Sequence, residues 1–225
     1  MVHVRTSVTR PDPKLIDGLA AFSSATIHEA QGRKGALSHR IKPVDDAMSF
    51  CGPAITVLSH PGDNIMVQVA ISYAEAGDVI IVNAGQLEQS GSFGDVLATA
   101  ASSKGVAAFV TDSGVRDSAD LRELGFPVFS GSVCIEGTVK ETLGLVNHTL
   151  SVGGQVVEPG DILRGDADGI VLVKPDEAEE VIRLCQERED HEAQLRDRHR
   201  AQEGSVIELH GLLEKLEAKG LTVEA

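Results

Sequence analysis

The sequence predicts an α/β fold with a parallel strand-helix core, an antiparallel portion and a C-terminal helical arm. Apolar runs at 78–85, 106–111 and 127–130 alternate with helical patterns, as expected for parallel strands joined by right-handed crossovers. Short β runs between glycine-rich turns at 137–175 indicate antiparallel pairing. We therefore expect a core over residues 1–175 and a helical arm over residues 176–225.

The expected elements follow in chain order. Residues 12–32 contain two short helices, of which the second is capped by Ser24 or Thr26 and stops at Gly32. The core elements are then a strand at 52–60, a helix at 64–77, a strand at 78–85, a helix at 94–105, a strand at 106–111, a helix at 117–125 and a strand at 127–130.

The arm is expected to be helical over 176–203, and its apolar face fades after residue 186. A helix that is polar all round gains little from packing on its own domain, so it either projects into solvent or lies against another subunit. Residues 205–216 are amphipathic again and need a partner for their apolar face. The pattern predicts an oligomer whose arm packs on a neighbouring subunit.

Composition excludes several classes of protein. The net charge of −14 disfavours nucleic acid as a partner, because nucleic-acid binding needs a basic surface. Cys51, Cys134 and Cys185 are far apart and odd in number, which indicates free thiols in a reducing compartment. We expect no signal peptide and no membrane partner, because no long apolar segment occurs, and hence a cytoplasmic protein.

The candidate site lies beyond the carboxyl ends of the predicted strands at 78–85 and 106–111. Ligands bind beyond the carboxyl ends of parallel strands, and Gly94-Asp95 follows the first of the two strands and begins a helix. The N–H groups of Val96 and Leu97 should be unpaired there, and such a helix start suits a carboxylate or phosphate.

Gly114-Val115-Arg116-Asp117 follows the second strand. Arg116 offers a planar fork for a carboxylate, and Asp117 a hard oxygen that suits Mg²⁺ or Mn²⁺, with Asp95 as a second carboxylate. The alternative is that Asp117 and Asp95 are only helix caps and that Arg116 pairs with a surface carboxylate. Glu29, near a helix start, is a further candidate because a carboxylate can act through metal-bound water.

The chain resembles the RraA-like superfamily, and within it the class II pyruvate aldolases that cleave 4-hydroxy-4-methyl-2-oxoglutarate and 4-carboxy-4-hydroxy-2-oxoadipate. The resemblance rests on "GDVLATAASSKGVAAFVTDSGVRDSADLRELGFPVF" and continues in "ATIHEAQGRKG", "GTVKETLG", "PGDIL" and "DADGIVLV". It spans roughly residues 12–216 and implies an αββα sandwich assembled as a homotrimer or homohexamer with sites between subunits.

The resemblance also implies roles for the candidate residues. Asp117 would be the direct ligand of Mg²⁺ or Mn²⁺, and Arg116 would hold the pyruvyl oxygens. Asp95 would hold a water molecule that is bound to the metal. Glu29 would be a carboxylate near the metal that is not one of its direct ligands. The backbone N–H groups that follow Gly94, those of Val96 and Leu97, would take the substrate carboxylate. Glu192 in the arm would reach the site of a neighbouring subunit.

The expected reaction is a metal-dependent retro-aldol cleavage that releases pyruvate, with oxaloacetate decarboxylation as a side activity. Two alternatives stay open. One is a protein-binding regulator of RNA decay without catalysis, a function also found in this superfamily. The other is an aldolase of the same fold that acts on another hydroxy-oxo acid.

Overall fold

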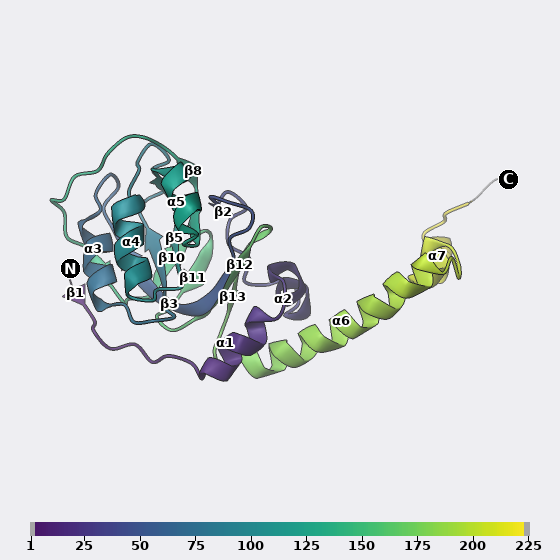
Figure 1. Ribbon diagram of the computed structural model, residues 1–225. Helices are drawn as coiled ribbons and strands as arrows, with labels where there is room; N and C mark the ends of the chain where they lie inside the picture. The colour runs from purple at the N-terminus through teal and green to yellow at the C-terminus, as the bar shows by residue number, and fades with distance from the viewer. Residues whose placement is uncertain (1–2, 223–225) are drawn as a thin grey trace.

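The computed structural model describes residues 3–222 of the chain. Its centre is a mixed sheet with seven strands along one path and a hairpin joined to the third of them (Figure 1). The path runs β1 (His3–Val4), β9 (Leu145–Val146), β3 (Phe50–Leu58), β4 (Val79–Asn83), β5 (Ala108–Thr111), β7 (Val128–Ser130) and β2 (Lys42–Pro43). The hairpin consists of β12 (Ile162–Asp166), which pairs with β3, and β13 (Gly169–Val173).

The four central strands β3, β4, β5 and β7 are parallel, as the sequence predicts. Ile55 is paired with Ile80, and Ile81 with Val110, and all four side chains are fully buried. These strands are continuous apolar runs because both of their faces are covered. The predicted antiparallel portion is also confirmed, in the β12–β13 hairpin and in the separate pair of β10 (Leu150–Val152) and β11 (Gln155–Val157).

Two groups of helices cover the sheet. The helices α3 (Ile65–Tyr73), α4 (Asp95–Ser103) and α5 (Ser118–Leu124) lie side by side over the central strands (Figure 1). The helices α1 (Pro13–Ala20), α2 (Ser24–Ala30) and the start of α6 (Ala178–Arg200) pack near the β12–β13 hairpin. This second group has a small apolar core of its own, formed by Leu19, Phe22, Ile27, Ile162, Val171, Val173, Ala178, Val181 and Cys185.

The second helix differs in one detail from the expectation. Its cap is Ser23, whose Oγ accepts a hydrogen bond from the N–H of Thr26, and not Ser24 or Thr26. Ser24 instead donates to Asp166 on β12, and Thr26 donates to Glu189 on α6. Three hydroxyl residues stand close together here, at positions 23, 24 and 26, and tertiary partners decide which of them is free to cap the helix.

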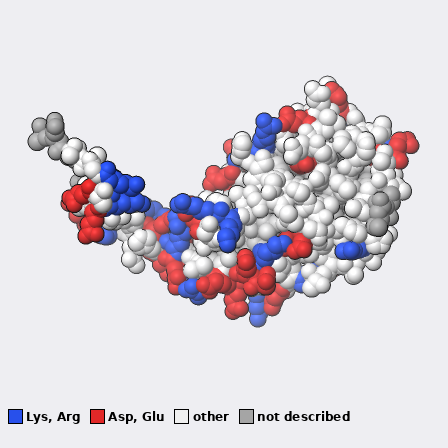
Figure 2. Space-filling view, turned by 180° about the vertical axis from the view of Figure 1, so that it is seen from behind, with Lys and Arg blue, Asp and Glu red and all other residues white. Residues whose placement is uncertain are grey.

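The arm projects away from the sheet and ends in the short helices α7 (Val206–Leu209) and α8 (Leu213–Ala218) (Figure 1). The amphipathic segment 205–216 is divided between these two helices, because Gly211 adopts a φ of 63° between them. Figure 2 shows acidic and basic side chains gathered on the arm, whereas much of the sheet domain seen from that side is uncharged. Among the described residues, no helix is long and apolar enough to cross a membrane.

Candidate active site

Two loops meet at the carboxyl ends of β4 and β5, where the sequence places the candidate site. Their backbones are joined step by step, through a bridge between Gly91 and Gly114 and a hydrogen bond of 2.9 Å from the N–H of Arg116 to the carbonyl of Phe93. The second loop also forms β6 (Gly114–Val115), which pairs in parallel with β8 (Ser132–Val133). This ladder fixes the start of α4 beside the Arg116-Asp117 pair.

Two aspartates hold backbone segments around this site in place. Asp112 Oδ1 accepts a hydrogen bond of 2.8 Å from the N–H of Ala84, although burial raises the pKa of this carboxyl above its ordinary value. Asp63 Oδ2 accepts from the N–H groups of Glu141 and Thr142 at 2.7 Å. Burial opposes the ionisation of Asp63, but the backbone N–H groups that donate to it outweigh burial and hold its pKa below the ordinary value.

Gly94 allows Asp117 to lie against the start of α4. A Cβ added to Gly94 would come within 3.0 Å of Asp117 Oδ2, a separation that real Cβ atoms essentially never show. Asp117 Oδ2 accepts a hydrogen bond of 3.3 Å from the N–H of Asp95, the first residue of α4. The absence of a side chain at residue 94 is thus a condition for the contact between the two loops.

The start of α4 carries the free donors that the sequence predicts. Within the described residues, the N–H groups of Val96 and Leu97 donate to no protein acceptor, and Gly94 supplies no side-chain cap. The helix has nine residues, so its dipole adds a partial positive charge at this end. Unpaired donors and positive potential together suit an anionic group.

Arg116 and Asp117 are neighbours in a strained backbone segment. Asp117 precedes α5 with a φ of 56°, in the left-handed region, and its side chain makes no capping hydrogen bond. Asp117 thus occupies the cap position of α5 without capping that helix through its side chain. Its Oδ2 lies 3.3 Å from Nε of Arg116, and the Arg116 side chain is about half exposed, at 48%. A left-handed non-glycine residue costs free energy, and such strain clusters at functional sites.

A cavity of about 310 Å³ opens above these groups. The segment 137–140 forms part of its wall, and the contacts of Asp63 and a hydrogen bond from Asn64 N–H to the carbonyl of Val139 hold this segment in place. The lining residues are Asn64, Gln68, Gly91, Ser92, Gly94, Asp95, Val96, Leu97, Arg116, Gly137, Thr138 and Lys140. Arg116, Lys140 and the start of α4 supply positive charge to this lining. In the part of the chain that the structure describes, Asp95 is its one acidic residue.

Asn64, Gln68, Thr138 and Lys140 are lining residues that sequence reasoning missed. Asn64 could have been found, because it follows β3, the parallel neighbour of β4, and the rule applied to the ends of β4 and β5 extends to that strand. Its side-chain N–H donates to the carbonyl of Ser92 at 3.1 Å. Lys140 carries no comparable signal, since it sits in a polar segment that joins the cavity only through tertiary contacts.

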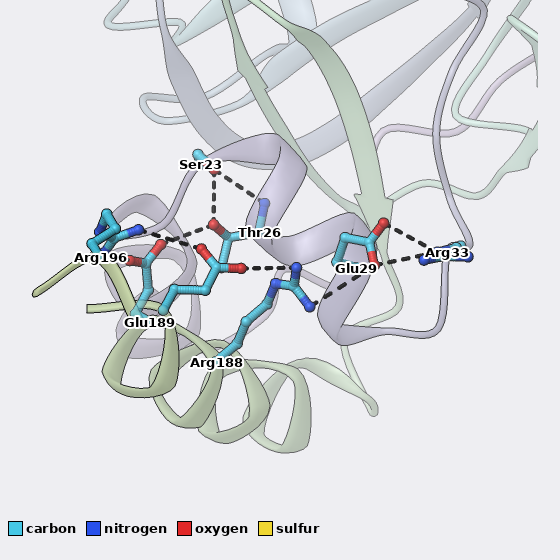
Figure 3. A network of polar contacts seen from close by, with 8 residues as sticks. Ser23, Thr26, Glu29, Arg33, Arg188, Glu189 and Arg196 are labelled. Carbon is cyan, nitrogen blue, oxygen red and sulfur yellow. Dashed lines mark hydrogen bonds and ion pairs between the residues drawn. The ribbon is translucent and has the colours of Figure 1, made fainter. Parts of the chain in front are cut away.

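Glu29 lies on α2, beside α6 (Figure 3), and Glu192 lies on α6. Neither lines the cavity of Arg116. Arg188 lies between them, with Nη1 at 3.9 Å from a carboxylate oxygen of Glu29 and Nη2 at 2.8 Å from one of Glu192. One copy of the chain therefore brings Asp95, Arg116, Asp117 and the start of α4 together, and holds the two glutamates as a separate pair.

Two of the three cysteines, Cys51 and Cys185, are poor nucleophiles. Burial raises the pKa of Cys51 to about 12 and that of Cys185 to about 11, so both thiols stay protonated at neutral pH. None of the three cysteines is in a disulfide, which agrees with the expectation of free thiols.

Comparisons with known proteins agree with this architecture. A protein of Halalkalibacterium halodurans named "Putative 4-hydroxy-4-methyl-2-oxoglutarate aldolase" is 34% identical over 181 residues, which cover 80% of this chain and 84% of that protein. The structure of RraAS2 from Streptomyces coelicolor, described as an unusual member of the RNase ES inhibitor RraA family, matches with a TM-score of 0.77 and 28% identity. That match covers 84% of this chain and 99% of RraAS2.

The structure of the RNA-processing inhibitor RraA from Thermus thermophilis matches with a TM-score of 0.61 and 28% identity, over 68% of this chain and 92% of that one. These structures share the mixed α/β fold with parallel and antiparallel strands described above. The model of the RraA-like family, described as Aldolase/RraA, matches residues 14–172, which include both loops of the cavity. The chain therefore belongs to the RraA-like family.

Proposed function

We propose that this protein is a divalent-metal-dependent aldolase that cleaves 4-hydroxy-4-methyl-2-oxoglutarate or 4-carboxy-4-hydroxy-2-oxoadipate and releases pyruvate. The observation that carries the proposal is the meeting of the free N–H groups of α4 and the guanidinium of Arg116 in one cavity, with the carboxylate of Asp117 beside them, 3.3 Å from Nε of Arg116. The name of the Halalkalibacterium halodurans relative supports the same reaction class.

The α4 start binds the substrate by its carboxylate in this proposal. The N–H groups of Val96 and Leu97 donate to the carboxylate oxygens, which places the 2-oxo group beside Arg116. When the C3–C4 bond breaks, negative charge develops on the former keto oxygen, and the fixed guanidinium stabilises it as an oxyanion donor does. The proton of the C4 hydroxyl leaves to a carboxylate, for which Asp95 lies in the cavity, and protonation at C3 then completes pyruvate.

Asp117 would hold Mg²⁺ or Mn²⁺. The donor set fits such an ion, because Mg²⁺ is usually held by one or two carboxylates with water in its remaining positions. In the described residues, no group of three His, Cys, Asp or Glu side chains could hold a metal, and the proposal names Asp117 as the protein ligand. A bound ion would act as a Lewis acid on the 2-oxo acid.

We propose further that residues 176–225 form an arm that packs on a neighbouring subunit in a homotrimer or homohexamer. Glu192 would then enter the cavity of the neighbour. The projection of α6 from the sheet domain and the absence of buried residues in the described helices α7 and α8 support this assignment (Figure 1).

The test is pyruvate release from 4-hydroxy-4-methyl-2-oxoglutarate, coupled to lactate dehydrogenase, with Mg²⁺, with excess EDTA and after Mg²⁺ is added back. We expect turnover that EDTA abolishes and Mg²⁺ restores, together with oxaloacetate decarboxylation. Arg116→Ala should lower kcat by about 10²-fold or more, by analogy with the loss of an oxyanion donor. Wild-type kcat in Arg116→Ala would refute the mechanism.

The second candidate is a protein-binding regulator, which the similarity to the two RraA structures favours. The same assay separates the two candidates. A wild-type protein that releases no pyruvate from either substrate would favour the regulator. Decarboxylation of oxaloacetate without cleavage of the first substrate would instead favour an aldolase for another hydroxy-oxo acid.

A further inference from the structure

One face of α6 continues as a charged stripe where its apolar face ends. Cys185 is buried, and Arg188, Glu189, Glu192 and Arg196 follow it at helical spacing. This stripe contacts α2 and not solvent alone: Thr26 Oγ1 donates to Glu189 Oε1 at 2.9 Å (Figure 3). The polar character of α6 after residue 186 is therefore partly explained by a polar interface within the chain.

Arg188 is the centre of this interface. Its two terminal nitrogens point to different carboxylates, Nη1 to Glu29 on α2 and Nη2 to Glu192 on α6. Arg33 lies on the far side of Glu29, with Nε at 3.1 Å, and Arg196 on the far side of Glu192, with Nη1 at 3.4 Å. The result is an alternating row of five charges that crosses from one helix to the other.

The exposed fractions rise toward the ends of this row. The Arg188, Glu29 and Glu192 side chains are 39%, 34% and 32% exposed, whereas that of Arg33 is 75% exposed. Two carboxylates held near one another repel, and a guanidinium between them offsets the repulsion and fixes both orientations. Lysine could not replace it fully, because a single ammonium lacks the planar fork that reaches two partners.

We propose that Arg188 is a positioning residue that holds Glu29 and Glu192 as one unit, which one copy of the chain contributes to the Arg116–Asp117 cavity of another copy. The inference rests on the proposed function and deepens it. Within one chain neither glutamate lines the cavity, and the α2–α6 contact is intramolecular, so an arm that delivers Glu192 delivers Glu29 with it. Each site would then combine the Arg116–Asp117 region of one copy with the Glu29–Glu192 pair of another copy.

The first experiment compares three arginine variants in the pyruvate-release assay of the full chain. Arg188→Met should lower kcat by about 10- to 100-fold with little change in KM, the size of effect seen when a supporting partner of a functional ligand is lost. Arg188→Lys should recover part of this loss, since it restores the charge without the fork.

Arg183→Met is the matched control. Arg183 is an exposed arginine of the same helix that pairs with Glu180 and Glu187, but it does not reach α2. It should keep the wild-type kcat. Equal kcat values in Arg188→Met and Arg183→Met, with equal melting temperatures, would overturn the role of Arg188.

The second experiment co-expresses pairs of inactive chains and asks which pairs regain activity. Glu29→Gln and Glu192→Gln should each regain activity with Arg116→Ala, because hybrid oligomers contain sites with both halves intact, about one quarter of all sites for random mixing in a ring. Glu29→Gln should not regain activity with Glu192→Gln, since both changes damage the same half.

The outcomes separate this inference from the proposed function. If the wild-type chain releases no pyruvate, the proposed function fails and the inference with it. If the wild-type chain is active but Glu29→Gln regains activity with Glu192→Gln, only the inference fails, because Glu29 would then belong with Arg116. If neither Glu29→Gln nor Glu192→Gln regains activity with Arg116→Ala, the inference that each site combines residues from two copies of the chain would be overturned.

Discussion

Gly94→Ala tests the geometry of the site without removing a functional group. Gly94 has φ −148° and ψ −168°, an extended conformation that alanine adopts without strain. The added Cβ would nevertheless fall inside van der Waals contact with Asp117 Oδ2 and lie 3.1 Å from Cγ of Arg116. Since the backbone contacts between the two loops hold Gly94 in place, the Arg116-Asp117 pair or the start of α4 must move.

The size of the effect follows from that displacement. Restoring ordinary contact requires a shift of roughly 1 Å, and a misplacement of that size at a reacting site costs about 10²-fold in rate. We expect kcat/KM for pyruvate release to fall by about this factor. The affinity for Mg²⁺, measured by the concentration that half-restores activity after EDTA, should fall as well, because Asp117 is the carboxylate displaced.

Gly154→Ala is the control for glycine replacement in general. Gly154, between β10 and β11, has a φ of 82° and nothing within 4 Å of an added Cβ. Its variant should lose about 1–2 kcal/mol of unfolding free energy through backbone strain, yet keep kcat/KM. A Gly94→Ala protein with wild-type kcat/KM and an unchanged melting temperature would refute the assignment of Asp117 to the site.

Two further predictions concern stability. Arg10 donates to both carboxylate oxygens of the fully buried Asp78 at 2.8 Å. Arg10→Ala should therefore lower the free energy of unfolding, measured in urea, by about 3–5 kcal/mol, because it leaves a buried carboxylate without its partner. A loss below about 1 kcal/mol would contradict the importance of the pair. At Asp166, burial opposes ionisation, but the hydroxyl and N–H of Ser24 outweigh it and hold the pKa below its ordinary value. A depressed pKa contributes stability above the pKa of the unfolded chain that is lost as pH falls through the folded-state pKa. Ser24→Ala should therefore be less stable than wild type at neutral pH by about 1.5–3 kcal/mol, and the difference should vanish at acid pH; a difference that does not change with pH would be contrary to this reasoning.

Much of the core can be predicted from local patterns. Apolar runs such as 78–85 and 106–111 predict buried parallel strands, and the structure confirms both with β4 and β5. The rule that ligands bind at the carboxyl ends of such strands was enough to bring Asp95, Arg116 and Asp117 into one candidate site. Arg116 and Asp117 closely follow the end of β5, whereas Asp95 lies further from the end of β4 and is brought beside them by the backbone contacts between the two loops.

Contacts between distant segments decided the rest. The wall at 137–140 depends on hydrogen bonds between Asp63 and the N–H groups of Glu141 and Thr142, residues 78 and 79 positions away in the chain. No periodicity in a sequence encodes such a pairing, because a buried carboxylate can accept from any N–H group that the fold brings near it.

The arm shows the same division. Its helical period and its polar surface follow from the sequence alone, since both depend on residues three and four positions apart. Only the tertiary structure sets the arm against α2 and places Arg188 between Glu29 and Glu192. The physical reason is that charged side chains on a helix have many possible partners of similar energy, and the packing of Leu19, Ile27 and Val181 beneath them selects one.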